Sequence, residues 1–218
     1  MKIKPILFNT EMVKAILDDR KTQTRRFVKY NKGEVKDLAS WFDYDKDSSN
    51  EPICFWFDVD HTYDLIEPYV RSGDILWVRE TWNYGYVETS EAEYSHEAWF
   101  EERDYKERGN DSFIDCISHF YYKADDEASD IGMTWRPSLH MPKEAARIFL
   151  RVNKIKVERL QDISESDINA EGSNSENFKN LWNSTIKKSD INKYSFEANP
   201  LVWVYEFERC EKPEEFLK

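Results

Sequence analysis

The sequence predicts an α+β fold, a mostly antiparallel β-barrel flanked by helices. Strand-like segments with alternating apolar residues recur along the chain, whereas segments of helical periodicity are short. In the segment 147–160 the apolar alternation slips by one residue near Asn153 and Lys154, which indicates a β-bulge and a strong bend. Small closed barrels need bent strands of this kind. A hydrophobic content of 40% is enough to fill a core.

The chain length of 218 residues suits a single domain, 1–218, that carries insertions. Two insertions are predicted, at about 30–64 and 85–115, because both segments are charged and irregular in pattern. The second is interpreted as holding a helix at 91–108.

Four strands and one helix are predicted between residues 3 and 123. Asn9 or Thr10 can cap that helix, which runs to about Asp19. Gly73 marks a turn before the third strand. The strands predicted from apolar alternation are 3–8, 22–28, 75–82 and 117–123.

Two prolines stiffen the loop 135–142, and Pro142 can open a short helix that follows. The long bent strand 147–160 comes next. The alternating segment 201–208 is predicted to be the last strand and to close the sheet.

Two helices are predicted between these last two strands. Ser164 begins a capping-box pattern for a helix that runs to about Glu171, where Gly172 can end it. Apolar residues at helical spacing over 178–186 indicate an amphipathic helix whose apolar stripe faces the core.

Composition excludes several functional classes. A net charge of −12 and a pI near 4.9 argue against a broad phosphate-binding face, so any nucleic-acid contact must be local. Three scattered cysteines are typical of reduced thiols in the cytoplasm. The four histidines form no pair at metal-ligand spacing, so we expect no metal and no cofactor. Neither a signal peptide nor a membrane span is predicted, and no membrane partner is expected.

The stretch 16–27 is the part of the sequence in which candidate functional residues lie closest together. It passes from a helix end into a β-favouring run that carries four cations: Arg20, Lys21, Arg25 and Arg26. On a strand Thr24 and Arg26 would share one face, so Lys21 can meet Thr24 only if the chain turns near Arg20 to Thr22. A plainer interpretation is a helix end that complements its own dipole, followed by a solvated strand edge.

Lys21, Thr24 and Arg26 match a signature, Gly-x-Lys-x-x-Thr-x-Arg, in which Asp19 stands where glycine is expected. With this match the chain resembles the ASCH family, a branch of the PUA-like folds. Four further segments resemble the long ASCH proteins that are common in phages and prophages; they are 73–82, 136–142, 158–163 and 199–204. The resemblance implies a PUA-like β-barrel.

The resemblance also implies a ligand and three catalytic residues. ASCH domains are associated with RNA or nucleosides, and one branch hydrolyses N4-acetylcytidine to cytidine and acetate with a Lys, a Thr and a Glu. These residues correspond to Lys21, Thr24 and Glu171 here. A lysine whose pKa is lowered by burial among cations can activate a threonine hydroxyl. The alternatives are a non-catalytic binding module for RNA or a modified nucleotide, a ribonuclease, or a protein-binding accessory factor.

A second set of residues is expected to bind the substrate, which is a nucleoside or single-stranded RNA: Arg20, Arg26, Glu80, Trp82, Trp135 and His140. Glu80 and His140 would orient a base edge, and Trp82 or Trp135 would stack on the base. Each has a plain structural alternative. Glu80 can pair with a neighbouring arginine, and the tryptophans can be core residues.

Overall fold

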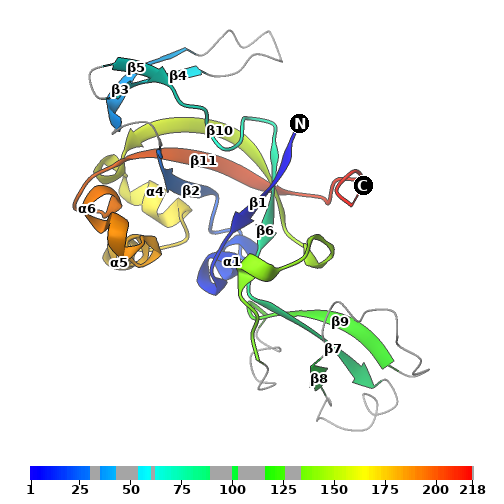
Figure 1. Cartoon of the computed structure of the whole chain (residues 1–218). Helices are drawn as coiled ribbons and strands as arrows, with labels where there is room; N and C mark the ends of the chain where they lie inside the picture. Colours follow the sequence, from blue (N-terminus) through cyan, green and yellow to red (C-terminus); the bar gives the residue numbers. More distant parts are fainter. Residues whose placement is uncertain are drawn as a thin grey trace.

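A computed structural model describes residues 1–29, 35–42, 54–59, 62–88, 100–102, 116–125 and 134–217. It is a mixed α+β structure with a five-stranded central sheet and two smaller sheets (Figure 1). The strands are β1 Ile3–Leu7, β2 Gln23–Phe27, β3 Val35–Phe42, β4 Cys54–Val59, β5 Thr62–Leu65, β6 Ile75–Arg79, β7 Trp82–Glu88, β8 Phe100–Glu102, β9 Cys116–Tyr122, β10 Phe149–Arg159 and β11 Leu201–Cys210. The α-helices are α1 Thr10–Leu17, α4 Glu165–Ala170, α5 Ser175–Thr185 and α6 Ile191–Tyr194; short 3-10 turns are η2 Ser138–His140, η3 Lys143–Ala145, η4 Leu160–Asp162 and η5 Lys188–Asp190.

The central sheet has the order β1-β6-β10-β11-β2. Only β1 and β6 run parallel; the other three pairs are antiparallel, as predicted for most of the sheet. Within the described residues β1 and β2 form the two edges, so the sheet is not closed into a barrel. The last strand is therefore not the closing one. β11 lies inside the sheet, between β10 and β2.

The predicted bulge is present in β10. The register between β10 and β11 shifts between Val152 and Lys154, where one extra residue, Asn153, enters the strand. Figure 1 shows both strands curving strongly along the sheet. An extra residue on one strand increases its local twist, which accounts for the bend.

The predicted strand 75–82 is two strands that belong to different sheets. β6 ends at Arg79 in the central sheet, and β7 begins at Trp82 and pairs with β8 and β9. The chain breaks at Glu80, whose buried carboxylate pairs with Arg147 and so ends the regular alternation. The predicted insertion boundary at about residue 85 falls inside β7, because Gly85 is one of the residues of that strand.

Both predicted insertions contain regular structure where they are described. In the first, β3, β4 and β5 form an antiparallel sheet rather than an irregular segment. In the second, 100–102 is strand β8, so the predicted helix 91–108 is wrong there; the rest of it lies outside the described residues. Alternating apolar residues in short segments resemble irregular sequence until a partner strand is known.

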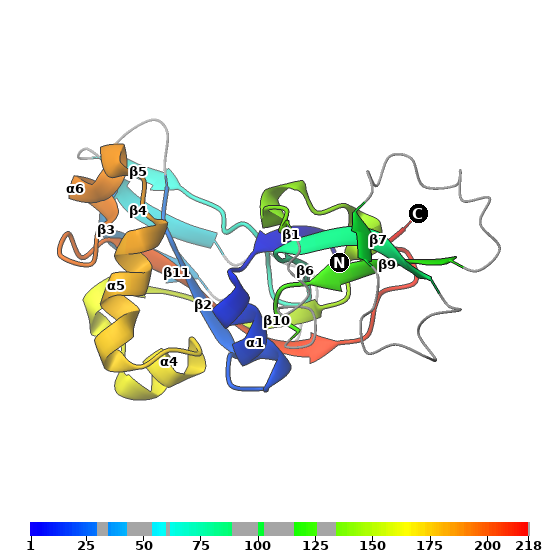
Figure 2. The same cartoon turned by 90° about the horizontal axis from the view of Figure 1, so that it is seen from below.

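Helices α4, α5 and α6 gather at one end of the central sheet, far from β7 and β9 (Figure 2). The described residues form three buried clusters: a large one that joins α1, the central sheet and β4, one beneath β7 and β9, and one beneath α5. The predicted caps are present. Asn9 accepts from the Met12 amide and Ser164 from the Asp167 amide. None of the described helices has both the length and the apolar character needed to cross a membrane.

Candidate active site

Two helix ends meet where the cationic stretch begins. After α1 the chain turns at Asp19, whose φ of 56° is left-handed, and the Lys21 amide donates to the Ala15 carbonyl. Lys21 then forms an isolated antiparallel bridge with Glu171, the residue that caps the C-terminus of α4. The turn at Asp18 and Asp19 thus comes just before the segment from Arg20 to Thr22, where the sequence placed it, and it directs Lys21 to Glu171.

The Lys21 side chain is fully buried and donates three hydrogen bonds. Its Nζ lies 2.7 Å from Glu171 Oε2, 2.9 Å from the Glu171 carbonyl oxygen and 2.8 Å from the Gln23 carbonyl oxygen. Burial lowers the pKa of the Lys21 ammonium, and the nearby charges of Arg26 and Arg25 add to this effect. Glu171 acts in the opposite direction but does not cancel the effect of burial.

Glu171 is shared between two buried cations. Its Oε1 lies 3.2 Å from Arg25 Nη1 while its Oε2 contacts Lys21. Arg25 also contacts Glu158 at 2.7 Å and Asp167 at 3.3 Å. Although Glu171 ends a helix, its side chain is not solvated, because it is only 7% exposed and both of its oxygens are paired with cations.

Thr24 lies on β2 and is fully buried. Its hydroxyl accepts a hydrogen bond of 2.9 Å from Arg26 Nη1. All three hydrogen bonds of Lys21 Nζ go elsewhere, so within the described residues the lysine does not hold the threonine hydroxyl. Arg26, by donating, stabilises negative charge on that oxygen instead.

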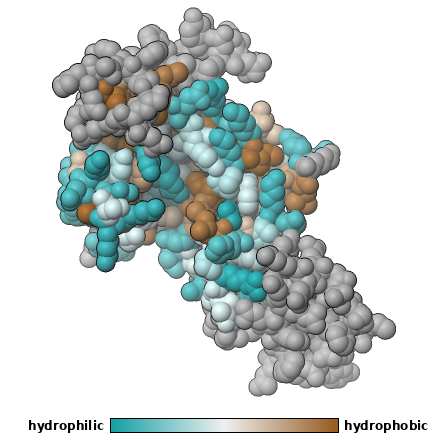
Figure 3. Space-filling view, in the orientation of Figure 1, coloured by the Kyte–Doolittle hydropathy of each residue, from teal (hydrophilic) through white to brown (hydrophobic). Residues whose placement is uncertain are grey.

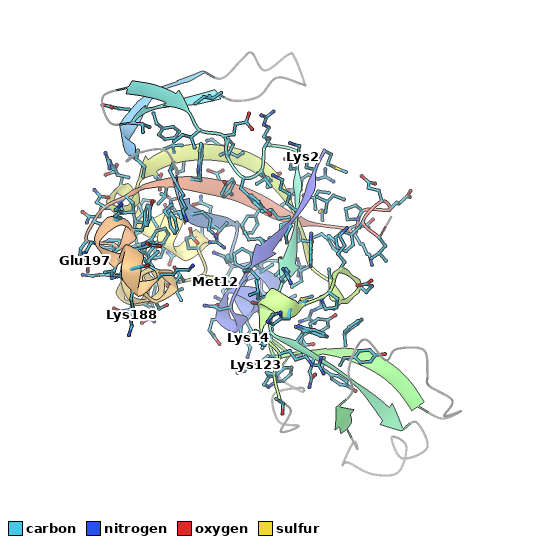
Figure 4. The ribbon with its side chains drawn as sticks, viewed as in Figure 1. Lys2, Met12, Lys14, Lys123, Lys188 and Glu197 are labelled. Carbon is cyan, nitrogen blue, oxygen red and sulfur yellow. The ribbon has the colours of Figure 1, made fainter. Side chains whose placement is uncertain are left out.

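A cavity of about 670 Å³ lies beside this cluster. Glu171, Arg25 and Arg26 are on its wall, whereas Lys21 and Thr24 lie behind the wall. The volume is in the range of pockets for nucleoside-sized ligands. Figure 3 shows apolar side chains on this face between the helical end of the molecule and β1, and Met12, which lines the cavity, lies on α1 in Figure 4.

Aromatic side chains from four parts of the chain complete the cavity wall: Phe27, Tyr69, Phe178, Trp182 and Tyr205. Sequence reasoning assigned two of them, on α5, to the core alone. Their helical stripe is buried, and its outer part also faces the cavity. Burial raises the pKa of Tyr205 to about 12, so this phenol is neutral at pH 7. A wall of this kind suits a planar ring.

The other predicted binding residues do not line the cavity. Arg20 is exposed and pairs with Asp18 at 2.8 Å. Glu80 is buried in a two-pronged ion pair, because Arg147 donates to both of its oxygens at 2.9 and 3.0 Å. Glu80 is therefore paired with an arginine, as the structural alternative for this residue predicted.

The two tryptophans and the histidine are also elsewhere. Trp82 is buried in the cluster beneath β7 and β9, with the Arg136 guanidinium 5.5 Å from its ring centre. Trp135 is half-buried and His140 is exposed, on the loop that leads to η3. Of the nine residues named from the sequence, only Arg26 and Glu171 face the cavity.

In the part of the chain that the structure describes, no three histidine, cysteine, aspartate or glutamate side chains are placed to hold a metal ion together. Comparisons with known proteins add no assignment: no protein-family model matches the chain, and neither does any curated protein or solved structure. The chemistry must be inferred from the residues themselves. They are a buried lysine with a lowered pKa, a carboxylate paired with it, and a hydroxyl held by an arginine, beside an aromatic cavity.

Proposed function

We propose that the chain is an ASCH-type protein whose cavity binds a nucleoside and that it removes an N-acyl group from a modified pyrimidine. The buried contact of 2.7 Å between Lys21 and Glu171, beside a cavity of about 670 Å³, supports this most directly. A buried residue whose pKa is shifted by desolvation and by a specific charge partner, next to a cleft, is typical of functional sites.

The proposal includes a PUA-like fold, in which side chains join the two edges of the sheet. Arg26 Nη2 on β2 donates to the Leu7 carbonyl oxygen on β1 at 3.2 Å, so these edge strands approach each other near the cavity. The curvature of β10 and β11 brings the edge strands β1 and β2 toward each other. A cytoplasmic location is part of the same proposal, and the free thiol of Cys210 is consistent with it.

In the proposed reaction Thr24 Oγ1 attacks the acyl carbon and the amide C–N bond breaks. The hydroxyl proton passes through Lys21 to the leaving exocyclic amine, and an acyl ester forms on Thr24. Water then cleaves the ester, which releases the acid and restores the hydroxyl. Substrate binding must bring Lys21 to Thr24, and catalytic hydrogen bonds commonly form only in such complexes.

The test is turnover of a panel of N4-acylated cytidines, with release of the acid followed by chromatography. Thr24→Val should abolish turnover because it removes the nucleophile and keeps the shape. Lys21→Arg should also be inactive, since a guanidinium does not give up its proton. Thr22→Val is the matched control, because Thr22 is exposed and lies two residues away; its turnover should be unchanged.

A non-catalytic binding module is the second candidate. It is favoured by the satisfied hydrogen bonds of Lys21 and by the position of Thr24 behind the cavity wall. Calorimetric binding of a nucleoside that is unchanged by Thr24→Val, with no turnover across the panel, would establish the module. Acid release that is lost only in the Thr24 and Lys21 variants would exclude it.

A further inference from the structure

Two arginines on the cavity wall, Arg26 and Arg79, have no carboxylate partner within the described residues. Arg26 donates only to neutral oxygens: the Thr24 hydroxyl at 2.9 Å, the Arg25 carbonyl at 2.9 Å and the Leu7 carbonyl at 3.2 Å. Arg25, the third arginine of the wall, is instead engaged by three carboxylates. Positive charge on this wall is therefore not fully compensated by the protein.

Arg79 is held in place without being neutralised. Its Nη2 donates to the Leu139 carbonyl oxygen, and its guanidinium carbon lies 5.6 Å from the centre of the Trp77 ring. Its Nε is enclosed and has no acceptor in the structure. Burial lowers the pKa of both Arg79 and Arg26; the charge of Glu171 acts in the opposite direction on Arg26 but does not cancel the effect of burial.

The two arginines flank one point at the end of β1. Leu7 pairs with Arg79 in the register of β1 and β6, and its carbonyl oxygen accepts from Arg26. Glu171, the one carboxylate among the described residues of the cavity wall, is paired with Lys21 and Arg25. Arg26 and Arg79 thus both line the cavity without a carboxylate bound to either guanidinium group among the described residues, although the charge of Glu171 also acts on Arg26.

We propose that Arg26 and Arg79 form an anion subsite of the cavity, so that its ligand is a nucleoside 5′-monophosphate rather than a neutral nucleoside. This rests on the proposed function and names its substrate class. Guanidinium groups match phosphate oxygens in charge and geometry, and the aromatic wall takes the base. In a protein with a net charge of −12, a local pair of cations is what allows an anion to enter.

The experiment compares cytidine, cytidine 5′-monophosphate and inorganic phosphate by titration calorimetry on the whole chain. We expect the nucleotide to bind at least about tenfold more tightly than the nucleoside, as charge-assisted hydrogen bonds predict. Arg79→Gln should remove this advantage and leave the affinity for cytidine within about twofold, and Arg26→Gln should independently remove the advantage of the nucleotide over the nucleoside. Arg71→Gln is the control, because Arg71 pairs with Glu67 and does not line the cavity.

Equal affinity for cytidine and its monophosphate in the wild-type protein would overturn the subsite. So would a nucleotide advantage that persists in both folded variants, with folding checked by circular dichroism, or inorganic phosphate binding as tightly as the nucleotide. A failure of the proposed hydrolysis can be told apart from a failure of the subsite. Suppose that the nucleotide advantage is present and depends on both arginines, while neither acylated cytidines nor their monophosphates are hydrolysed. The anion subsite is then supported and the proposed amidohydrolase activity is rejected.

Discussion

At the scale of single residues, the candidate site is built on one carboxylate, that of Glu171, which is paired with the buried cations Lys21 and Arg25. Breaking a buried ion pair costs about 3–5 kcal/mol, whereas replacing a whole pair with apolar residues is often neutral. Stability alone therefore does not require the Lys21–Glu171–Arg25 cluster. Because burial lowers the pKa of Lys21, the cluster contains an amine that loses its proton more readily than a free lysine does.

The pH dependence of turnover in the variant Glu171→Gln tests whether the Lys21 amine is the catalytic base. Glu171 raises the pKa of Lys21, so removing its charge should lower that pKa further. The neutral lysine needed as a base then appears at lower pH, and the rising limb of the pH–rate profile should move toward acid. The maximal rate should fall at the same time, because the carboxylate that holds the Lys21 side chain in place is lost.

Glu158→Gln is the control for this shift. Glu158 contacts Arg25 and Lys156 but not Lys21, so the rising limb of the pH–rate profile should move less in Glu158→Gln than in Glu171→Gln. A profile that is identical in Glu171→Gln and the wild type would show that Lys21 is not the titrating base.

At the scale of elements, the site depends on the close approach of α1 to the end of α4. Gly172 has a φ of +75°, and a Cβ built on it would lie 2.6 Å from Ala15 Cβ and 3.1 Å from Lys21 Cβ. No side chain fits there while Lys21 remains bridged to Glu171. The glycine is needed for close packing as well as for its conformation.

Gly172→Ala should therefore lower both stability and turnover, and Gly73→Ala is its matched control. Gly73 has a similar φ of +85°, with no atom within 4 Å of the Cβ position. Both changes incur the backbone cost of about 1–3 kcal/mol. Overpacking should destabilise Gly172→Ala by roughly a further 1–3 kcal/mol. Urea denaturation measures the difference, and equal losses in the two variants would contradict the close approach.

At the scale of the whole molecule, the cations of the 20–26 stretch do not form a binding surface. Lys21 and Arg25 are buried and paired, and Arg20 pairs with Asp18. Each of these three cations is therefore already paired with a carboxylate of the protein. Arg26 is the one that faces the cavity without a carboxylate among the described residues.

Duplex RNA should accordingly bind weakly, and its affinity should fall only gently with salt. One or two phosphate contacts correspond to a slope of about −1 to −2 in log affinity against log salt concentration. Fluorescence anisotropy between about 50 and 200 mM salt measures this slope. A slope near −6 would reveal a broad basic face and contradict the placement of these cations.

Local features could be read directly from the sequence. The caps at Asn9 and Ser164, the bulge at Asn153 and the helix end at Gly172 all appear where they were predicted. Each depends on hydrogen bonds or periodicity within a few residues, which the neighbouring sequence contains. The left-handed turn at Asp19 was not predicted, because asparagine and glycine adopt this conformation more readily than aspartate does.

Only the tertiary structure decided which distant residues meet. Lys21 and Glu171 are 150 residues apart, and their contact requires the end of α4 to lie against the start of β2. The sequence pattern also did not show that Glu80 would pair with Arg147 or that Arg79 would join Arg26 on one cavity wall. Periodicity determines which face of an element is apolar, but it does not determine strand order. Strand order is set by how all the apolar faces are buried together, and that collective packing placed two of the nine named residues on the cavity wall.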